Sequence, residues 1–437
     1  MILTSISRSR FANKSTMLII IKILLSIVIV FIVIYTIRHY MLTLNRLFGR
    51  QRHPYIDIDT ADWPSVTVLV AAHNEEAVIS HSLDALLKVH YPKDKLKIIV
   101  VNDRSVDRTK EIVDQYVANS QGIIIPLHRT EGMTPGKAAA LKDATNIVTS
   151  DIIIVFDADY IPGSGLIKQL AAPFFDPEVG LVMGRVVPVN TATNLLTRLL
   201  DLERAGGYQV DQQARMNMGL VPQYGGTVGG VRMSALRSVG GWLDDTLAED
   251  TDLTYRAILK GWKSVYQNRS ECYEEVPETW AVRIRQIKRW AIGHNQAFFR
   301  YTFKCIRGKN LTLREKIDGV LLLGVYMMSP ITMLGWILSI ILFYNGDMNL
   351  VSGTLAVFSV AAYGTLGNSA AFFEISSATY LDGSKNRIRL LPLNFLSFII
   401  SMFSITRATI RPIVRNGNKT PIWEKTQRFR STSFKVL

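Results

Sequence analysis

The sequence predicts an α/β domain with a doubly wound sheet, held between membrane-spanning segments. Two observations lead to this prediction. Short apolar runs alternate with stretches of helical spacing from residue 65 onward, and long apolar stretches lie on either side of this part of the 437-residue chain. Alternating strands and helices indicate a sheet with helices on both faces, and ligands then bind at the carboxyl ends of its strands.

The first long apolar stretch covers residues 17–37 and is nearly unbroken. Roughly 20 apolar residues suffice to cross the hydrocarbon core of a bilayer. A cleaved signal peptide is the alternative, but its apolar core is usually shorter and no A-x-A-like cleavage site follows here. We therefore predict an uncleaved transmembrane anchor over 17–37, with a tail at 1–16 and a connecting segment at 38–64.

The elements after the anchor alternate between two patterns. Continuous apolar runs are typical of strands buried on both faces, whereas apolar residues three or four apart indicate a helix. Asp107 stands where an N-cap is expected before a helix. The predicted elements are a strand over 66–72, a helix over 77–89, a strand over 96–101, a helix over 107–117 and a strand over 152–156.

The C-terminal part contains apolar stretches at 320–344, 350–379 and 390–410. We predict a cytosolic catalytic domain over 65–316, a membrane region of two to four spans or interfacial helices over 317–410, and a basic tail over 411–437. One N-terminal and three C-terminal spans would put this basic tail outside the cell, against the positive-inside rule, if the catalytic domain is cytosolic. One stretch is therefore expected to be interfacial or re-entrant, or to line a sugar channel.

The formal net charge of +14 is the next constraint. The basic residues gather beside the membrane segments, which suits a cytoplasmic membrane protein in contact with anionic lipids. Nucleic acid is not expected as a partner, because no compact basic helix with aromatics and no zinc-finger spacing occurs. With two cysteines in the chain, a disulfide framework and a Cys-rich metal site are also excluded.

Carboxylates follow two of the predicted strands. Asp103 comes after the strand over 96–101, and Asp157 and Asp159 form a D-x-D after the strand over 152–156. Two acidic groups this close repel each other unless a cation compensates them. Mg²⁺ or Mn²⁺ bridging a nucleotide diphosphate would do so, because these ions favour carboxylate and phosphate oxygens. A solvated turn is the alternative for this motif.

Other polar residues are placed to contact a nucleotide sugar. The turn after the first strand contains Asn74 and Glu75, at a carboxyl strand end where ligands bind. Asp103 could hold a base or a ribose. Lys137 follows Gly136 and supplies a cation suited to phosphate, although a solvated lysine is the alternative.

Two further motifs lie downstream. Glu249 and Asp250 precede an apparent helix and follow a Gly-rich stretch, and a carboxylate here could serve as the base for an acceptor hydroxyl. Acidic residues in a first helical turn can also simply stabilise the helix dipole. Gln286, Arg289 and Trp290 share one helical face, where Arg289 could bind a diphosphate and Trp290 could stack on a sugar. An interfacial membrane helix is the alternative for this face.

In this order the motifs resemble those of the processive family-2 membrane glycosyltransferases, which include cellulose, hyaluronan and poly-N-acetylglucosamine synthases. The resemblance covers residues 65–290 and the flanking membrane segments. It implies an A-type glycosyltransferase (Rossmann-like) domain flanked by transmembrane helices, and an inverting, metal-dependent hexosyltransferase. Ala248 replaces the threonine that cellulose synthases carry before Glu-Asp, so the product need not be cellulose.

The resemblance also implies a role for each motif residue. The implied base is Asp250, beside Glu249, and the implied metal ligand is Asp159. Those implied to bind the nucleotide sugar or the acceptor end are Asp103, Asp157, Gln286, Arg289 and Trp290.

The predicted function is transfer from a UDP-sugar, with glucose or N-acetylglucosamine favoured, to a growing β-linked polysaccharide. Mg²⁺ or Mn²⁺ is the expected cofactor. Accessory export subunits are a further partner class that the resemblance allows. Two alternatives stay open: transfer of a single sugar to a lipid acceptor, and a non-catalytic membrane subunit that binds nucleotide without turnover.

Overall fold

The computed structural model describes residues 2–53, 62–346 and 367–414. Within these residues, eight strands form one sheet in the order β3-β2-β1-β4-β7-β6-β8-β5. The strands are β1 (Val66–Ala72), β2 (Leu96–Asp103), β3 (Ile124–Arg129), β4 (Ile152–Asp157), β5 (Ile161–Pro162), β6 (Val179–Pro188), β7 (Gly229–Arg232) and β8 (Lys263–Glu274).

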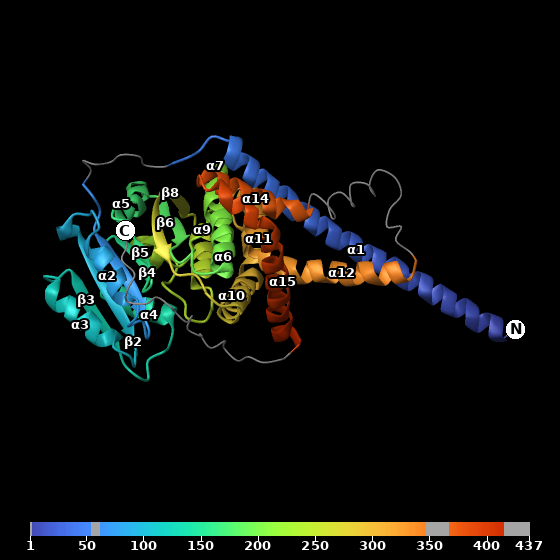
Figure 1. The fold of residues 1–437 in the computed structure, drawn as a ribbon, viewed down its shortest axis with the longest axis horizontal. Helices are drawn as coiled ribbons and strands as arrows, with labels where there is room; N and C mark the ends of the chain where they lie inside the picture. Colours follow the sequence, from blue (N-terminus) through green and yellow to red (C-terminus); the bar gives the residue numbers. More distant parts are fainter. Residues whose placement is uncertain (1, 54–61, 347–366, 415–437) are drawn as a thin grey trace.

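The parallel half of the sheet runs β3-β2-β1-β4 (Figure 1), and its three inner strands β2, β1 and β4 are largely buried on both faces. Successive side chains of a strand point to opposite faces, so Val68 and Val70 of β1 enter one core and Leu69 enters the other. The first core is covered by α2 (Ile79–Leu87), α3 (Thr109–Asn119) and α5 (Leu166–Ala171). The second is covered by α4 (Lys137–Thr145), α8 (Met233–Ser238) and α9 (Glu249–Leu259).

The predicted strands agree with β1, β2 and β4, except that β2 and β4 extend to include Asp103 and Asp157. Asp103 is therefore the last residue of β2, and Asp157 is the last residue of β4. The helix predicted to begin near Asp107 begins at Thr109, and the Asp107 Oδ1 accepts a hydrogen bond from the Thr109 N–H at 3.0 Å.

The sheet differs from a purely parallel doubly wound one because β7 runs antiparallel to β4 and β6. The Gly-rich sequence that leads into β7 has no strand signature, which is why its place in the sheet was not predicted. Glycine is required at this crossing: a Cβ at Gly229 would lie 2.5 Å from the ring of Tyr224, and one at Gly230 would lie 2.7 Å from Phe174.

Two short helices belong to the sheet domain: η1 (Lys93–Lys95) leads into β2 and η2 (Ala172–Phe175) follows α5. The other helices build the side of the molecule opposite the parallel strands (Figure 1), and they are α1 (Ile2–Phe48), α6 (Leu195–Ala205), the π-helix η3 (Gly206–Gln212), α7 (Gln213–Met218), α10 (Trp280–Arg307), α11 (Leu313–Leu323), η4 (Val325–Met327), α12 (Met328–Tyr344), α14 (Gly367–Leu381), η6 (Lys385–Leu390) and α15 (Leu391–Val414).

Three helices in the described part of the chain are long and apolar enough to cross a membrane, over Ser15–Phe48, Val325–Tyr344 and Lys385–Arg411. They indicate a membrane-associated protein. Helix α1 is longer than the predicted anchor at both ends, and its apolar side chains are exposed, Ile20 by 52% and Ile23 by 56%, as a lipid-facing surface requires. In Figure 1, α1 and α12 project together from the helical side of the molecule, away from the sheet.

Parts of the predicted membrane region lie outside the described residues. These are residues 347–366, which include most of the stretch predicted at 350–379, and residues 415–437 of the basic tail. Helix α14 covers the end of the stretch at 350–379 and packs against α1.

Candidate active site

The candidate site lies at the carboxyl edge of the parallel strands. Asp103, at the end of β2, stands opposite Arg129 of β3, and Asp157, at the end of β4, stands opposite Ala71 of β1. Strand order reverses at β1, which has β2 on one side and β4 on the other. Such a reversal opens the crevice in which open α/β sheets bind ligands.

Asp103 is buried, and both of its carboxylate oxygens accept hydrogen bonds from other residues of the chain. Its carboxylate accepts hydrogen bonds from Arg129 Nη1 at 2.6 Å, Arg104 Nε at 2.9 Å and the Gly136 N–H at 3.1 Å. Burial alone would raise the pKa of Asp103, but the bonds from Arg104 and Gly136 and the charge of Arg129 outweigh it and hold this pKa below its ordinary value. Asp103 thus fixes the loop that ends at Gly136, immediately before Lys137.

Lys137 begins α4 and forms an ion pair with Asp157. Burial would lower the pKa of Lys137, but attraction to Asp157, Glu249 and Asp250 raises it, so the ammonium stays charged. The Asp157 N–H donates to the Thr227 hydroxyl at 3.1 Å, which ties the end of β4 to the Gly-rich loop before β7. One cation is therefore shared by the D-x-D and the Glu-Asp motif.

Glu249 and Asp250 form the first turn of α9 and are partly exposed. Burial, against the attraction of Lys137, raises the pKa of Glu249 to about 7, and the repulsion of Asp250 adds to the rise. Burial also raises the pKa of Asp250. Gly226, with φ +73°, lies against this pair: a Cβ there would be 3.0 Å from the Asp250 Cβ. Glycine is thus required for the loop to approach the pair this closely.

The D-x-D fits a divalent cation only in part. Asp159 is 2% exposed and follows Asp157 by two residues. Across the part of the chain that the structure describes, no group of three or more His, Cys, Asp or Glu side chains is arranged to hold a metal ion. Carboxylate oxygens suit Mg²⁺ and Mn²⁺, which commonly take the rest of their ligands from substrate phosphates and water. The donor set therefore fits an ion that arrives with a diphosphate.

Gln286, Arg289 and Trp290 lie on α10, in contact with α6. The Gln286 Oε1 accepts from Arg283 Nη1 at 2.9 Å, and the partly exposed Trp290 ring lies 5.3 Å from the Arg283 guanidinium and 5.1 Å from that of Arg204. These cations engage the indole by cation–π contact. A small hollow beside them is lined by Leu200, Glu203, Arg204, Val276, Pro277, Arg283 and Gln286.

Asn74 and Glu75 join two loops at the edge of the sheet. The Asn74 N–H donates to the Ser105 hydroxyl at 2.9 Å, the Asn74 side-chain oxygen accepts from the Val106 N–H at 2.8 Å, and the Glu75 N–H donates to the Thr109 hydroxyl at 2.7 Å. Asn74 has a φ of +55°, a conformation that Asn tolerates better than most residues. These contacts hold the loops after β1 and β2 together beside Asp103.

The structure brings Asp103, Lys137, Asp157, Glu249 and Asp250 to one edge of the sheet, with Asp159 buried behind the end of β4. Sequence reasoning missed several supporting residues. Arg129 and Thr227 belong to no motif, and the chain of Tyr160, Glu274 and Arg204, in which the Tyr160 hydroxyl donates to Glu274 at 2.6 Å, joins residues far apart in sequence. Arg129 faces Asp103 through the register of β3 against β2, which no local sequence pattern specifies.

Comparison with known protein sequences gives three findings. Residues 64–293 match the family described as Glycosyltransferase like family 2. The probable glycosyltransferase YdaM of Bacillus subtilis (strain 168) is 29% identical over 402 residues, which are 90% of this chain and 92% of that protein. The probable glucomannan 4-beta-mannosyltransferase 1 of Arabidopsis thaliana is 29% identical over 315 residues, which are 68% of this chain but only 56% of that protein.

Among solved structures, the mannosyltransferase PcManGT from Pyrobaculum calidifontis, in complex with GDP-Man and Mn²⁺, has a TM-score of 0.56 to this chain at 21% identity. The likeness covers 83% of this chain and 97% of that one. It is a likeness of fold.

Proposed function

The chain belongs to the glycosyltransferase-like family 2, and from this premise we propose that it is an inverting enzyme that extends a β-linked polysaccharide from a nucleoside-diphosphate sugar at a membrane. Its fold is the A-type glycosyltransferase fold that the motif resemblance implies. The observation that supports the proposal most directly is the meeting of Lys137 with Asp157, Glu249 and Asp250 at the carboxyl edge of the sheet.

Asp250 is the proposed general base. It takes the proton of an acceptor hydroxyl while the hydroxyl oxygen attacks the anomeric carbon, from the face opposite the departing nucleoside diphosphate. A base works best when its pKa lies near the working pH, and burial raises the pKa of Asp250 in that direction. Because Asp250 acts as a carboxylate, activity should fall as the pH drops through its pKa.

Cations of the chain would stabilise the leaving group. Lys137 is placed beside Asp157, and Arg289 lies on α10 next to Trp290, where each could attract the diphosphate as negative charge develops on it. Asp159 is the residue that would hold a divalent ion, and such an ion would neutralise the charge of the diphosphate. In the same proposal Asp103, Asn74 and Glu75 form the nucleotide side of the site.

The donor is proposed to be a UDP-sugar, with glucose or N-acetylglucosamine favoured by the motif resemblance. GDP-mannose is the second candidate, because the Arabidopsis relative is named as a glucomannan mannosyltransferase. The chain spans about half the length of that relative.

The acceptor is proposed to be a polysaccharide held near Gln286 and Trp290, whose ring is partly exposed. The membrane helices would keep the catalytic domain on the cytosolic side of the cytoplasmic membrane. A lipid acceptor that receives one sugar is the alternative.

The test is turnover by the full chain in nanodiscs, offered radiolabelled UDP-glucose, UDP-N-acetylglucosamine and GDP-mannose with Mg²⁺ or Mn²⁺. Asp250→Asn is the inactive variant expected, and Asp114→Asn is its matched control, because Asp114 is an exposed carboxylate on α3. Products are sized and digested with linkage-specific glycosidases.

A ladder of long products from one donor, lost in Asp250→Asn and kept in Asp114→Asn, supports the proposal and names the sugar. A single lipid-linked product supports the lipid alternative. Undiminished turnover by Asp250→Asn would refute the assignment of the base, and binding of nucleotide without turnover of any donor would favour a non-catalytic subunit.

A further inference from the structure

Thr251, the residue after the proposed base, contacts the Asp250 carboxylate twice. Its N–H donates to Asp250 Oδ1 at 2.6 Å, and its hydroxyl oxygen lies 3.3 Å from the same atom in a hydrogen bond. The side chain is 1% exposed, so water does not compete for the hydroxyl. A buried hydroxyl beside a carboxylate has one proton to give, and the direction of that proton decides how strongly the carboxylate is stabilised.

Gln223 occupies one lone pair of this hydroxyl. The Gln223 Nε2 donates to Thr251 Oγ1 at 2.7 Å. Because an amide nitrogen cannot accept, the Thr251 proton must point elsewhere. Two acceptors are in reach: Asp250 Oδ1 at 3.3 Å and His294 Nδ1 at 3.5 Å.

The second acceptor, His294, has a defined charge and a defined tautomer. Its Nε2 lies 3.0 Å from the Leu322 carbonyl oxygen, and a carbonyl can only accept, so Nε2 carries the proton. Burial lowers the pKa of His294 and keeps the ring neutral. Its Nδ1 is therefore an acceptor that competes with Asp250 for the one proton of Thr251.

We propose that the Thr251 hydroxyl is a positioning group for the base, donating to Asp250 while that carboxylate is ionised and turning to His294 when Asp250 takes up a proton. This inference rests on the proposed function of Asp250. The ionised base is stabilised by one extra hydrogen bond, and the protonated base does not leave the buried hydroxyl without an acceptor. Thr251 thereby sets the pH below which the base is inactive.

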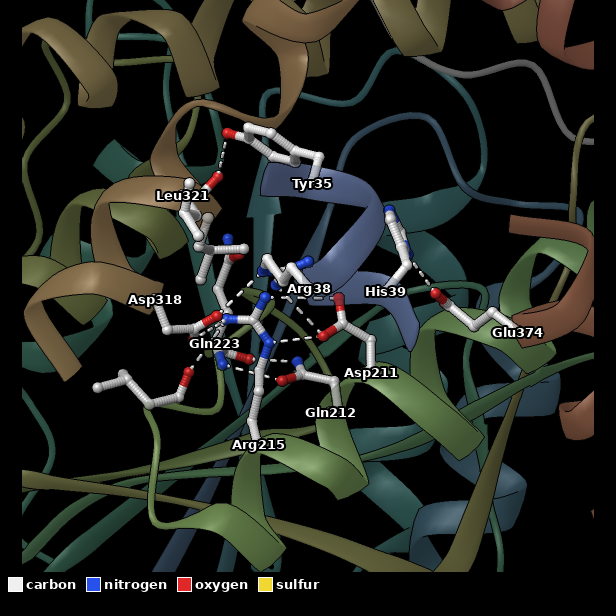
Figure 2. Close-up of polar contacts among 12 residues, drawn as sticks. Tyr35, Arg38, His39, Asp211, Gln212, Arg215, Gln223, Asp318, Leu321 and Glu374 are labelled. Atoms are coloured by element: carbon white, nitrogen blue, oxygen red, sulfur yellow. Dashed lines mark hydrogen bonds and ion pairs between the residues drawn. The ribbon is translucent and has the colours of Figure 1, made fainter. Parts of the chain in front are cut away.

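The group that directs Thr251 is itself anchored to the first membrane helix. Gln223 and Gln212 are joined by two bonds: Gln212 Nε2 donates to the Gln223 carbonyl oxygen at 2.8 Å, and the Gln223 N–H donates to Gln212 Oε1 at 3.0 Å. Gln212 ends the π-helix η3, beside Asp211. Arg38 of α1 donates to Asp211 at 3.5 Å and to Asp318 of α11 at 3.0 Å, and Figure 2 shows these contacts side by side.

These contacts form a path from α1 to the base that includes the backbone between Asp211 and Gln212 and the backbone of Gln223. π-Helical turns are rare and often occur at functional sites. Here the turn places two consecutive residues on different partners, Asp211 on Arg38 and Gln212 on Gln223. Gln212 thus holds the backbone of Gln223, while the neighbouring Asp211 pairs with α1.

Other titratable groups also face Asp250 and must be kept constant in any test. They come from α9, α4, η3, the loop before β7, η4 and α10, and they are Glu249, Lys137, Tyr208, Tyr224, Tyr326 and His294. Of these groups only His294 contacts the Thr251 side chain. Burial keeps its ring neutral, so a change on the acid side of the pH profile (the acid limb) reports on the hydroxyl.

The experiment measures kcat/KM of the full chain in nanodiscs from about pH 5 to pH 9 for Thr251→Val, Thr251→Ser and Thr254→Val. Valine keeps the shape of threonine without its hydroxyl, and serine keeps the hydroxyl. Thr254 is the matched control, because it lies on the same helix, is fully buried and donates to the backbone carbonyl oxygen of Asp250 at 2.8 Å instead of to the carboxylate.

In Thr251→Val the acid limb of the kcat/KM profile should shift to higher pH by about one unit. At a given pH on that limb, activity should therefore fall about tenfold. Thr251→Ser should restore the limb, and Thr254→Val should leave it in place whatever its effect on thermal stability. Gln223→Met, which removes the donor to the hydroxyl, should move the limb in the same direction by a smaller amount.

An unmoved limb in a folded Thr251→Val would overturn the proposal, and so would an equal shift in Thr254→Val. If Thr251→Val does not fold, the pH profile of Gln223→Met is the deciding measurement. An acid limb at the same pH as in the unmodified protein would then refute the role of the hydroxyl. Failure of the proposed function is seen separately, as turnover that survives Asp250→Asn, whatever the limb does in the Thr251 variants.

Discussion

Replacing Lys137 by methionine removes the one cation that the D-x-D and the Glu-Asp motif share. The Lys137 ammonium pairs with Asp157 and attracts Glu249 and Asp250. Methionine keeps the length and the apolar stem of lysine, so the packing at the start of α4 is retained. The three carboxylates then lose this shared positive charge, and their ionised forms become less favourable.

The size of the effect follows from the geometry. Two unit charges about 4 Å apart interact by about 4 kcal/mol at an effective dielectric constant of about 20. The side chains of Lys137 and Asp157 are 18% and 30% exposed, so solvent screens part of this attraction. A cation beside a carboxylate commonly lowers its pKa by about 1 to 3 units. We expect removal of Lys137 to raise the pKa of the Glu249–Asp250 pair by about one to two units.

The sign of the pH dependence is set by the base. Asp250 works as a carboxylate, so a higher pKa moves the acid limb of kcat to higher pH. Lys137→Met should therefore lose activity by about tenfold or more near pH 6 and recover part of it near pH 9. Initial rates at fixed free Mn²⁺ and saturating donor provide the profile. Lys142→Met is the control, because Lys142 is exposed on the same helix.

One result would refute this reasoning. If Lys137→Met raises KM for the donor at every pH and leaves the acid limb in place, then Lys137 binds the diphosphate and does not control the protonation of the base. Equal loss of activity in Lys142→Met would instead show that α4 is disturbed as a whole.

Three further predictions concern the same edge of the sheet. Arg129→Met leaves the buried Asp103 with one arginine partner fewer and should lower the free energy of unfolding by about 3 kcal/mol, measured by denaturant titration in detergent, with Arg129→Lys losing less. Gly226→Ala should reduce kcat about tenfold or more, because its Cβ would lie 3.0 Å from the Asp250 Cβ, whereas Gly240→Ala, also at positive φ but with open space around it, should not. Chelation with EDTA should abolish turnover, and added Mn²⁺ or Mg²⁺ should restore it; turnover that persists in EDTA would contradict the metal requirement.

Several features of the fold could be predicted from local sequence. The strands β1, β2 and β4 were located to within two residues, because strands largely buried on both faces are nearly continuous apolar runs, with polar residues gathered at their ends. The same rule placed Asp103 and Asp157 at the edge of the sheet. The apolar length of α1 likewise predicted a helix able to cross a membrane.

Other features could not be predicted because they depend on which distant segments meet. The antiparallel β7 is a short glycine-containing strand that is specified by the packing of its neighbours. Trp290 appeared as a platform for a sugar, and only the fold of α6 against α10 placed Arg204 and Arg283 beside its ring. Side chains of this kind carry no local pattern.

The sequence by itself determined the alternation of strands and helices, the apolar membrane segments, and the order of the acidic motifs, because each depends on residues a few positions apart. Only the tertiary structure decided which charges and hydroxyls act together. Lys137 meets Asp157 across 20 positions, and Gln223 meets Thr251 across 28. Such pairs are set by strand order and helix packing, since a side chain meets a distant partner only where the backbone brings both to the same edge of the sheet.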